Sequence, residues 1–352
     1  MDVTQLHPLW LRDNCPCPEC RHESGQRLLD TRAIPDDLAI ASHVVTRPRH
    51  MGSHGTSGDV VEIIFSDGHA SRFDLGWLAA NTGPGGPRPR RLWDASIQDS
   101  LPLAYHDDVA AGGAALGDWL RYVDELGFAI LGRCPTEPGT VTRVAELFGF
   151  VRETNYGRLF DVKTVVNPTN LAYTGLGLGA HSDNPYRDPT PTLQLLHCLA
   201  SSADGGENTL VDAFRVVEDL PRDDVELLAT RPVRFRYTDA ETDLETETTV
   251  ISLDARGDVQ AVRYNTRSAQ PFRLPTGDVR RFYAAYQRFG RLLEEPRYRI
   301  QFKLDAGGLF IVDNLRVLHG RTGYSSSGGE RHLQGCYADR DGLRSTLAVL
   351  SR

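Results

Sequence analysis

The sequence has no long hydrophobic run and no excess of positive charge. No stretch of about 18 consecutive apolar residues occurs, so we expect no helix that crosses a membrane. The first residues also lack a basic segment followed by an apolar one, and we therefore expect no secretory signal. The formal net charge of −8 argues against a nucleic-acid-binding surface. We expect neither nucleic acid nor a membrane as a partner.

Cysteine is also scarce for a protein stabilised by disulfides. Three of the six cysteines lie together at Cys15, Cys17 and Cys20, and the other three are scattered along the chain. This distribution does not resemble the disulfide framework of a secreted protein. The pattern favours a reducing compartment, and we expect the protein to be cytoplasmic.

The length and the proline and glycine content predict two domains. A chain of 352 residues can form one large domain and a smaller one. Residues 81–91, "NTGPGGPRPRR", form a proline- and glycine-rich linker. We place a small N-terminal domain at residues 1–95 and a second domain at residues 96–352. We find no internal repeat.

The cysteines of the N-terminal region have the spacing C-x-C-x-x-C in "LWLRDNCPCPEC". Three thiolates this close together can hold a tetrahedral metal ion if a fourth ligand completes the set. His69 follows a turn signal, Asp67-Gly68, between two strand-like runs, and this position suits the fourth ligand. A Cys3His site has no open position, so we expect structural zinc. The alternative is a loop of free thiols. Other histidines in the region are His22, His43, His50 and His54.

The second region begins with helical patterns and then becomes rich in strands. Leu116, Leu120, Val123 and Leu126 recur at helical spacing, and Gly127 ends that helix. Short strand-like runs follow, interrupted by helical patterns near residues 214–229 and 277–293. We predict a mainly β fold with flanking helices: a double-stranded β-helix (jelly-roll) core beside a small N-terminal α+β zinc-binding domain.

The stretch "AYTGLGLGAHSDNPYRDPTPTLQLLHC" carries the main chemical signal. Successive residues of a strand point to opposite sides, so His181 and Asp183 share a face while Ser182 points away. His319 in "DNLRVLHGR" supplies a second imidazole. Two histidines and one carboxylate form the facial triad of non-haem Fe(II) oxygenases. In the alternative interpretation His181 is a turn residue and His319 a core histidine. His197 is a competing ligand, but its apolar surroundings favour a core position.

An Fe(II) centre with three free positions needs a co-substrate to activate O2. A 2-oxo acid can chelate the metal and leave one position for O2, and its remote carboxylate then needs a partner with a permanent charge. Arg331, on the strand that follows His319, is our candidate, and Arg321 is the nearest rival. The hydroxyl of Thr209 is a possible further contact, although an ordinary strand threonine is an equal alternative.

Four segments together resemble the gamma-butyrobetaine/trimethyllysine hydroxylase family. They are "LWLRDNCPCPEC", "NLAYTGLGLGAHSDNPYRDP", "LQLLHCLASSADGGENTLVDAF" and "DNLRVLHGRTGY" with "RHLQGCYADRD". The resemblance covers nearly the whole chain in the right order. It implies an Fe(II)- and 2-oxoglutarate-dependent dioxygenase with a jelly-roll core, an N-terminal zinc module and a homodimeric assembly. It supports the triad, Arg331, and zinc ligation by Cys15, Cys17, Cys20 and His69. We expect assays in vitro to need ascorbate.

The resemblance also implies how the substrate is held. The family binds a quaternary ammonium group among aromatic rings, whose faces attract a cation that cannot donate a strong hydrogen bond. The matching positions here are Tyr156, Phe160, Tyr173 and Tyr337. Phe160 departs from the tryptophan of many relatives. Asn170 and Asn265 match the positions that hold the substrate's carboxylate end, although each is also explained by turn chemistry.

We therefore expect hydroxylation of a small trimethylammonium compound, with gamma-butyrobetaine to L-carnitine as the first candidate. Trimethyllysine or trimethylammonioethylphosphonate are the alternatives within this class. A non-catalytic ligand-binding protein is the alternative from a different class. The acidic segment 237–250, "YTDAETDLETETTV", is either a lid over the site or a solvated surface, and both interpretations stay open.

Overall fold

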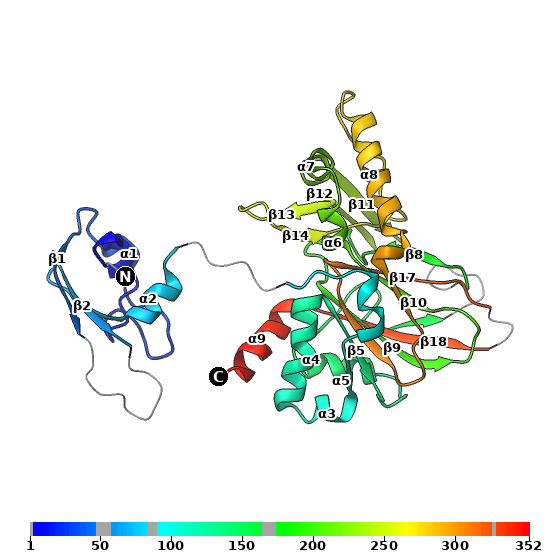
Figure 1. Cartoon of the computed structure of the whole chain (residues 1–352), viewed down its shortest axis with the longest axis horizontal. Coiled ribbons are helices and arrows are strands. Elements are labelled where there is room, and N and C mark those ends of the chain that lie inside the picture. Colours follow the sequence, from blue (N-terminus) through cyan, green and yellow to red (C-terminus); the bar gives the residue numbers. More distant parts are fainter. Residues whose placement is uncertain (1–2, 47–57, 84–89, 164–173, 326–328) are drawn as a thin grey trace. The chain divides into compact units, whose positions relative to one another are not determined.

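The computed structural model describes residues 3–46, 58–83, 90–163, 174–325 and 329–352. The chain divides into two compact units, Met1–Arg88 and Pro89–Arg352, and each is described by itself (Figure 1). Within these residues no helix combines the length and the apolar character that a membrane crossing needs. The domain limits expected above, 1–95 and 96–352, stay a prediction.

The N-terminal unit is a three-stranded antiparallel sheet with helices on one face. The sheet has the order β1-β2-β3, with α1 before it and α2 after it. The bounds are α1 Pro8–Asp13, β1 Ile40–Thr46, β2 Val60–Phe65, β3 Ala70–Asp74 and α2 Leu75–Asn81. Alternate residues of β2, namely Val61, Ile63 and Phe65, are buried in the core of this unit, as the two-residue period of a strand requires.

The larger sheet of the second unit has seven strands. Its order is β4-β5-β16-β9-β18-β6, and β7 also pairs with β18. Only the β4–β5 pair is parallel. The bounds are β4 Leu103–Tyr105, β5 Phe128–Gly132, β6 Val151–Arg152, β7 Phe160–Lys163, β9 Leu193–Ser201, β16 Leu309–Asp313 and β18 Arg331–Ala338.

A second sheet of four antiparallel strands faces the first. Its order is β15-β10-β17-β8. The bounds are β8 Leu178–His181, β10 Asn208–Asp212, β15 Arg299–Phe302 and β17 Val317–Arg321. One apolar cluster contains Phe128, Leu196 and Phe310 of the larger sheet together with Leu210 and Ile300 of the smaller one. The two sheets therefore enclose a common core, which confirms the predicted jelly roll.

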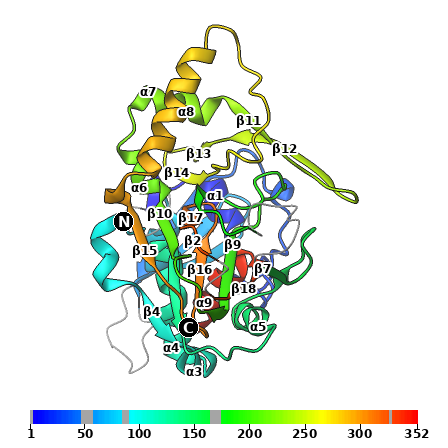
Figure 2. The same cartoon turned by 90° about the vertical axis from the view of Figure 1, so that its right-hand side faces the viewer.

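Helices cover the outer faces of both sheets. In Figures 1 and 2, α3, α4, α5 and α9 lie on one side of the strand layers and α6, α7 and α8 on the other. The bounds are α3 His106–Ala110, α4 Gly113–Leu126, α5 Thr140–Glu146, α6 Ala213–Glu218, α7 Arg222–Thr230, α8 Val279–Leu293 and α9 Arg340–Leu350. The helix expected before Gly127 is α4, and Gly127 ends it with a left-handed φ of 80°. The two helical interruptions correspond to α6–α7 and to α8.

The acidic segment 237–250 forms most of a β-hairpin. Strands β11, Pro232–Thr238, and β12, Asp243–Thr249, pair in antiparallel register, and Figure 2 shows the hairpin extending away from the strand layers. A second small pair, β13 Ile251–Leu253 with β14 Val259–Val262, follows it. Arg236, Tyr237 and Thr238, which adjoin the turn of the first hairpin, line the cavity described below.

A buried ion pair connects the strands to the helices. Arg316, in the turn between β16 and β17, donates from Nε and Nη2 to the two carboxylate oxygens of Asp212, at 3.1 and 2.8 Å. The same guanidinium donates to the backbone oxygens of Glu125 and Arg91, while Asp212 accepts from the N–H of Phe214 at the start of α6. Both side chains are almost fully buried. Removing either partner would leave an uncompensated buried charge.

The substitution Arg316→Met should therefore destabilise the second unit. We expect a loss of about 3–5 kcal/mol in the free energy of unfolding, because Asp212 is left without its cation. Urea denaturation followed by circular dichroism measures it. The control is Arg121→Met, which removes the exposed Arg121–Asp118 pair on α4 and should cost no more than about 1 kcal/mol. Equal losses for the two variants would contradict the assigned role of Arg316.

Candidate active site and N-terminal metal site

The N-terminal unit brings three cysteines and one histidine together. The Sγ atoms of Cys15, Cys17 and Cys20 lie 3.3, 3.6 and 3.5 Å from Nε2 of His69. Zinc bonds to sulfur and nitrogen of the usual lengths place the two atoms about 3.5 Å apart in a tetrahedron. All six cysteines of the chain are free thiols. The four side chains thus fit one tetrahedral zinc ion and leave no open position for chemistry.

Arg12 holds two parts of this cluster in place. Its Nη1 donates to Sγ of Cys20 at 3.1 Å, and its Nε donates to Oδ2 of Asp67 at 3.1 Å. Asp67 in turn accepts the N–H of His69 at 2.9 Å through Oδ1. A guanidinium beside a thiolate favours its charged form. Arg12 therefore connects the cysteine loop to the hairpin turn that carries the histidine.

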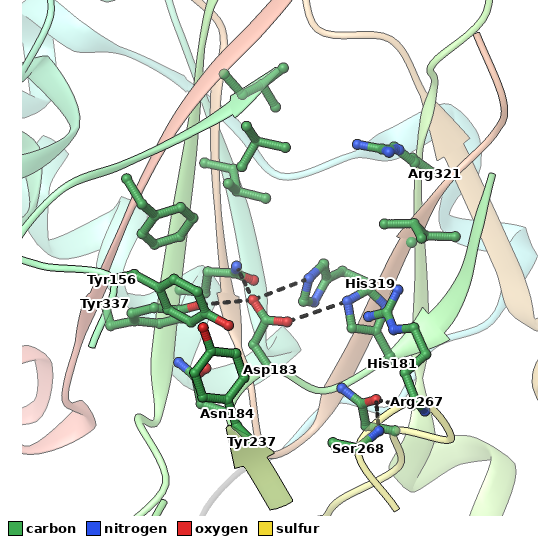
Figure 3. Close-up of a pocket in the computed structure, with 18 of the residues that line it drawn as sticks. Tyr156, His181, Asp183, Asn184, Tyr237, Arg267, Ser268, His319, Arg321 and Tyr337 are labelled. Atoms are coloured by element: carbon green, nitrogen blue, oxygen red, sulfur yellow. Dashed lines mark hydrogen bonds and ion pairs between the residues drawn. The ribbon is translucent and has the colours of Figure 1, made fainter. Parts of the chain in front are cut away.

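In the second unit, two neighbouring strands bring the predicted triad together. His181 ends β8 and lies directly opposite His319 of β17 in the antiparallel register. The centroids of the two imidazole rings are 4.4 Å apart. Asp183 follows β8, with Oδ1 3.3 Å from Nε2 of His181 and Oδ2 3.8 Å from Nε2 of His319. Figure 3 shows the carboxylate facing both imidazoles. One ligand atom from each residue lies within 4.8 Å of the others.

The backbone on either side of the carboxylate is fastened to two other segments. Asn314 accepts the N–H of Asp183 at 2.7 Å and donates to its C=O at 2.9 Å. Ser182 donates its N–H to the carbonyl of Tyr264, and Tyr264 donates back to the Ser182 hydroxyl. As expected from alternation, Ser182 points away from the triad. These bonds fix the segment without using the side chain of Asp183.

Hydrogen bonds also orient the triad side chains. Nδ1 of His181 donates to the carbonyl of Gly179 at 2.9 Å, which leaves Nε2 free to accept a metal. Oδ2 of Asp183 accepts from Nε2 of Gln194 at 2.6 Å and from the hydroxyl of Tyr337 at 2.9 Å. Oδ1 of the same carboxylate faces Nε2 of His181.

Electrostatics hold Asp183 and His319 in the protonation states that a metal requires. Burial opposes ionisation of Asp183, but the bond with His181 and the potentials of both imidazoles outweigh it, so its pKa lies below the usual range. Burial, followed by the charge of His181, lowers the pKa of His319 to about 3. At neutral pH Asp183 is therefore a carboxylate and His319 a neutral imidazole, the forms in which these side chains bind Fe(II).

Arg331 lies in β18 with its guanidinium buried beside the triad cavity. Nε donates to the carbonyl of Gly206 and Nη2 to Oδ1 of Asn208, each at 3.1 Å. Nη1 is buried and has no hydrogen-bond partner among the described residues. Burial lowers the pKa of Arg331, yet guanidinium stays charged at neutral pH. A carboxylate is the partner that such a group lacks.

The neighbours of Arg331 differ from the expected set in one respect. Asn208 lines the cavity, whereas Thr209 is not among the lining residues. Thr209 lies opposite Gly320 in the register, and successive strand residues face opposite sides. A Cβ at position 320 would lie 2.8 Å from the Thr209 hydroxyl and 2.5 Å from the Leu178 carbonyl. Only glycine therefore fits there without moving the neighbouring strands.

The rival arginine is already bonded to the backbone. Arg321 donates from Nη2 to the carbonyl of Thr174 and from Nε to that of Leu176. Burial and the charge of Arg331 lower its pKa to about 10. Arg321 lines the same cavity, so two buried cations face one end of it. This end suits a dianion.

Aromatic rings form a wall of the same cavity. Phe160 stacks on Tyr337 with centroids 5.2 Å apart, and Tyr156 lies 6.0 Å from Phe160. Tyr237 of β11 meets Tyr156 edge-on at 5.7 Å and stacks on Tyr186 at 5.2 Å. A Cβ at Gly335 would lie only 2.4 Å from the Phe160 ring, so that glycine makes room for it. The five rings face a cavity of about 480 Å³ that the triad also lines.

The remaining predicted substrate residues divide into two groups. Asn170 and Tyr173 lie outside the described residues. Asn265 lines the cavity, but its amide is occupied: Nδ2 donates to the carbonyl of Ser182, and Oδ1 accepts from the N–H groups of Arg267 and Ser268.

Several residues of this site were not expected from the sequence. Gln194 had a local signal, because it is the polar residue in the apolar run "LQLLHC", as did Tyr186, three residues after Asp183. Tyr237 and Arg267 had none. Each comes from a segment far from the motif in sequence.

Comparison with known proteins supports both units. Residues 94–337 match the model of the taurine catabolism dioxygenase TauD, TfdA family. The chain belongs to this family. Residues 2–79 match the model described as gamma-butyrobetaine hydroxylase-like, N-terminal. Together the matches confirm the resemblance noted from the motifs.

Individual relatives extend over nearly the whole chain. The gamma-butyrobetaine dioxygenase of Pseudomonas sp. (strain AK-1) is 36% identical, covering 99% of this chain and 91% of the relative. The human gamma-butyrobetaine dioxygenase is 30% identical, covering 98% and 91%. The trimethyllysine dioxygenase of Bos taurus is 29% identical, covering 99% and 83%.

Solved structures show the fold. An asparagine oxygenase in complex with Fe(II), hydroxyasparagine and succinate has a TM-score of 0.52 at 19% identity, covering 65% of this chain and 81% of that one. A putative alpha-ketoglutarate-dependent taurine dioxygenase from Burkholderia xenovorans has a TM-score of 0.53 at 12% identity, covering 68% and 89%. The family and the donor set establish the chain as an Fe(II)- and 2-oxoglutarate-dependent dioxygenase. The expected enzyme class, with Fe(II) and 2-oxoglutarate, is confirmed.

The variant Cys17→Ser should lose zinc. Cys17 is partly exposed, so serine fits in its place, but a hydroxyl is a much weaker zinc ligand than a thiolate. We expect elemental analysis to find about one zinc per chain in the wild type and almost none in the variant. The control Cys134→Ala changes a cysteine of the second unit and should keep its zinc. Full zinc content in Cys17→Ser would show that the cluster does not hold the ion.

The variant Asp183→Ala should lose Fe(II) binding and stay folded. The backbone bonds to Asn314 survive, so the cost is limited to the unsatisfied Gln194 and Tyr337 donors, about 1–3 kcal/mol. Anaerobic calorimetric titration with Fe(II) measures binding, and circular dichroism measures folding. Asp161→Ala, which removes a carboxylate bound to His332, is the control. Unchanged iron affinity in Asp183→Ala would contradict the ligand assignment.

Proposed function

We propose that the protein hydroxylates a C–H bond of a small trimethylammonium compound, with gamma-butyrobetaine to L-carnitine as the first candidate. The balanced reaction consumes the substrate, O2 and 2-oxoglutarate. It yields the hydroxylated substrate, succinate and CO2. One oxygen atom enters the new hydroxyl group and the other enters succinate.

The cluster of aromatic rings beside the triad carries this proposal. A trimethylammonium group has a positive charge but no N–H to donate, so ring faces are its natural partners. Tyr156, Phe160 and Tyr337 were expected to form such a cage, and Tyr186 and Tyr237 lie next to them. Burial raises the pKa of Tyr237 above its usual value, and the pKa values of Tyr186 and Tyr337 are also raised by burial. The hydroxyls therefore stay neutral at physiological pH.

The chain's own residues have distinct tasks in this reaction. His181, Asp183 and His319 would hold Fe(II), which supplies O2 activation when 2-oxoglutarate is bound. The free Nη1 of Arg331 would bind the remote carboxylate of 2-oxoglutarate. Asn208 orients that guanidinium and takes the place that Thr209 was expected to fill. Gln194 orients Asp183 by donating to its Oδ2.

Positioning decides which carbon reacts. The triad and the cage line one cavity. When the rings hold the ammonium group of a substrate, each of its carbons lies within a limited range of distances from the metal position. Tyr337 contributes to both sites, because its ring stacks on Phe160 while its hydroxyl donates to Asp183. It therefore ties the cage to the triad at a fixed distance.

Other trimethylammonium substrates are the second candidates. Trimethyllysine is favoured by the 29% identity to the trimethyllysine dioxygenase of Bos taurus, and trimethylammonioethylphosphonate has the same cationic group. The rings do not distinguish these compounds, since all three carry one. The non-catalytic alternative is set aside, because the family consists of dioxygenases and the donor set is intact.

Several further expectations stay predictions. The Cys3His cluster would hold structural zinc, the protein would be a homodimer, and ascorbate would sustain activity in vitro. A cytoplasmic location would keep the cysteine cluster reduced, as zinc ligation requires.

The direct test is an assay with Fe(II), ascorbate and 2-oxoglutarate against three substrates in parallel: gamma-butyrobetaine, trimethyllysine and trimethylammonioethylphosphonate. For gamma-butyrobetaine we expect a product about 16 Da heavier that matches L-carnitine, with one succinate per product. Mass spectrometry reads both. A higher kcat/KM for one of the other two compounds would reassign the substrate. No hydroxylated product from any of them would refute the proposal.

A further inference from the structure

Arg267 differs from the other arginines of the active-site cavity in having no partner. Four arginines line it: Arg236, Arg267, Arg321 and Arg331. Arg236 is paired with both carboxylate oxygens of Asp243, at 2.8 and 2.6 Å. Arg321 and Arg331 are bonded to backbone carbonyls. In the part of the chain that the structure describes, the guanidinium of Arg267 makes neither a hydrogen bond nor an ion pair.

A short bonded turn fixes the position of Arg267. Oδ1 of Asn265 accepts the N–H of Arg267 at 3.1 Å and that of Ser268 at 3.2 Å. Nδ2 of the same amide donates to the carbonyl of Ser182 at 3.0 Å. Ser182 separates the two triad residues of the H-x-D motif, so the turn is tied to the metal-binding segment itself. Asn265 is therefore a positioning residue. Its amide is already hydrogen-bonded, so a carboxylate of the ligand could bind it only by breaking one of these bonds.

The charge of Arg267 acts on the triad cavity. Desolvation in the cavity lowers the pKa of its guanidinium, and the carboxylate of Asp183 acts in the opposite sense. Arg267 also contributes to lowering the pKa of His319. A guanidinium stays protonated in proteins, so the cavity holds a fixed cation whose only nearby carboxylate, among the described residues, belongs to the triad.

The cage and Arg267 lie on different sides of the triad. In Figure 3 Tyr156, Tyr237 and Tyr337 lie on one side of Asp183, and Arg267 lies on the other, toward His181. Neutral ring faces attract a quaternary ammonium, whereas the fork of a guanidinium matches a carboxylate or phosphonate. A molecule that reaches from the rings to the guanidinium would therefore extend past Asp183.

We infer that Arg267 binds the anionic end of the trimethylammonium substrate, a carboxylate or phosphonate. The inference rests on the proposed function and deepens it. It assigns the anion to a charged side chain in place of the amide of Asn265, which is already hydrogen-bonded, whereas the expectation for Asn170 stays a prediction. A trimethylammonium compound without an anionic end would bind the cage alone and would be a poor substrate.

The test uses Arg267→Gln and two ligands, gamma-butyrobetaine and its uncharged primary amide. In the wild type we expect kcat/KM for the acid to exceed that for the amide by about 10- to 100-fold, the value of one charge-assisted pair. In Arg267→Gln the acid should lose about that factor and the amide should change little. Arg267→Lys keeps the positive charge but lacks the planar set of donors of a guanidinium. Its ratio of kcat/KM for acid over amide should lie between those of the wild type and Arg267→Gln.

Two controls show whether the lost factor belongs to the anionic end of the substrate. Arg236→Gln changes an arginine of the same cavity that is already paired, and it should keep the preference for the acid. The KM for 2-oxoglutarate and the slow succinate formation without substrate should be unchanged in Arg267→Gln. A raised KM for 2-oxoglutarate would instead assign Arg267 to the co-substrate and overturn the inference.

The outcomes also distinguish the inference from the proposed function. If the wild type hydroxylates gamma-butyrobetaine and Arg267→Gln discriminates acid from amide equally well, the inference fails and the function stands. If the wild type hydroxylates no trimethylammonium compound, the function fails before any variant is compared. Because Arg267 is exposed to the cavity and unpaired among the described residues, both variants should melt at the wild-type temperature.

Discussion

The active site depends on the pairing of β8 with β17. This register places His181 and His319 directly opposite each other, with ring centroids 4.4 Å apart. A shift of one residue would turn one of the two imidazoles to the opposite face of the sheet. The chain prevents such a shift at two points, because Asn314 fastens Asp183 and the Tyr264–Asn265 turn fastens Ser182. Everything else at the site is built around these fixed strands.

The buried cations of the second unit differ in their partners. Arg316 and Asp212 neutralise each other in the interior. Arg331 and Arg267 differ, since the described residues offer them no carboxylate partner. A cation that is even partly removed from water without a counter-ion costs free energy. Two such cations in one cavity are explained if each binds an anionic group. Arg331 would bind 2-oxoglutarate and Arg267 the anionic end of the substrate.

The N-terminal unit also contains a group of side chains that a ligand would complete, here a metal ion that would add to its stability. Its core is small, and a small core supplies limited stability. Three thiolates and an imidazole provide a site that a structural zinc would close, and Arg12 ties the cysteine loop to the turn before His69. The hairpin β2–β3 contributes the histidine and also the core residues Ile63 and Phe73. Metal binding and core formation in this unit therefore depend on the same strands.

The sequence by itself determined the donor sets, because they rest on residue types and short spacings. His181 and Asp183 follow from strand alternation, the cysteines from C-x-C-x-x-C, and the jelly roll from many short strands. Tertiary structure decided the rest. It selected Asn208 over Thr209, placed Tyr237 in the aromatic wall and brought Arg267 to the triad. Those contacts join segments that are distant in the chain, and their register is set by packing and hydrogen bonds between strands, which local spacing does not encode.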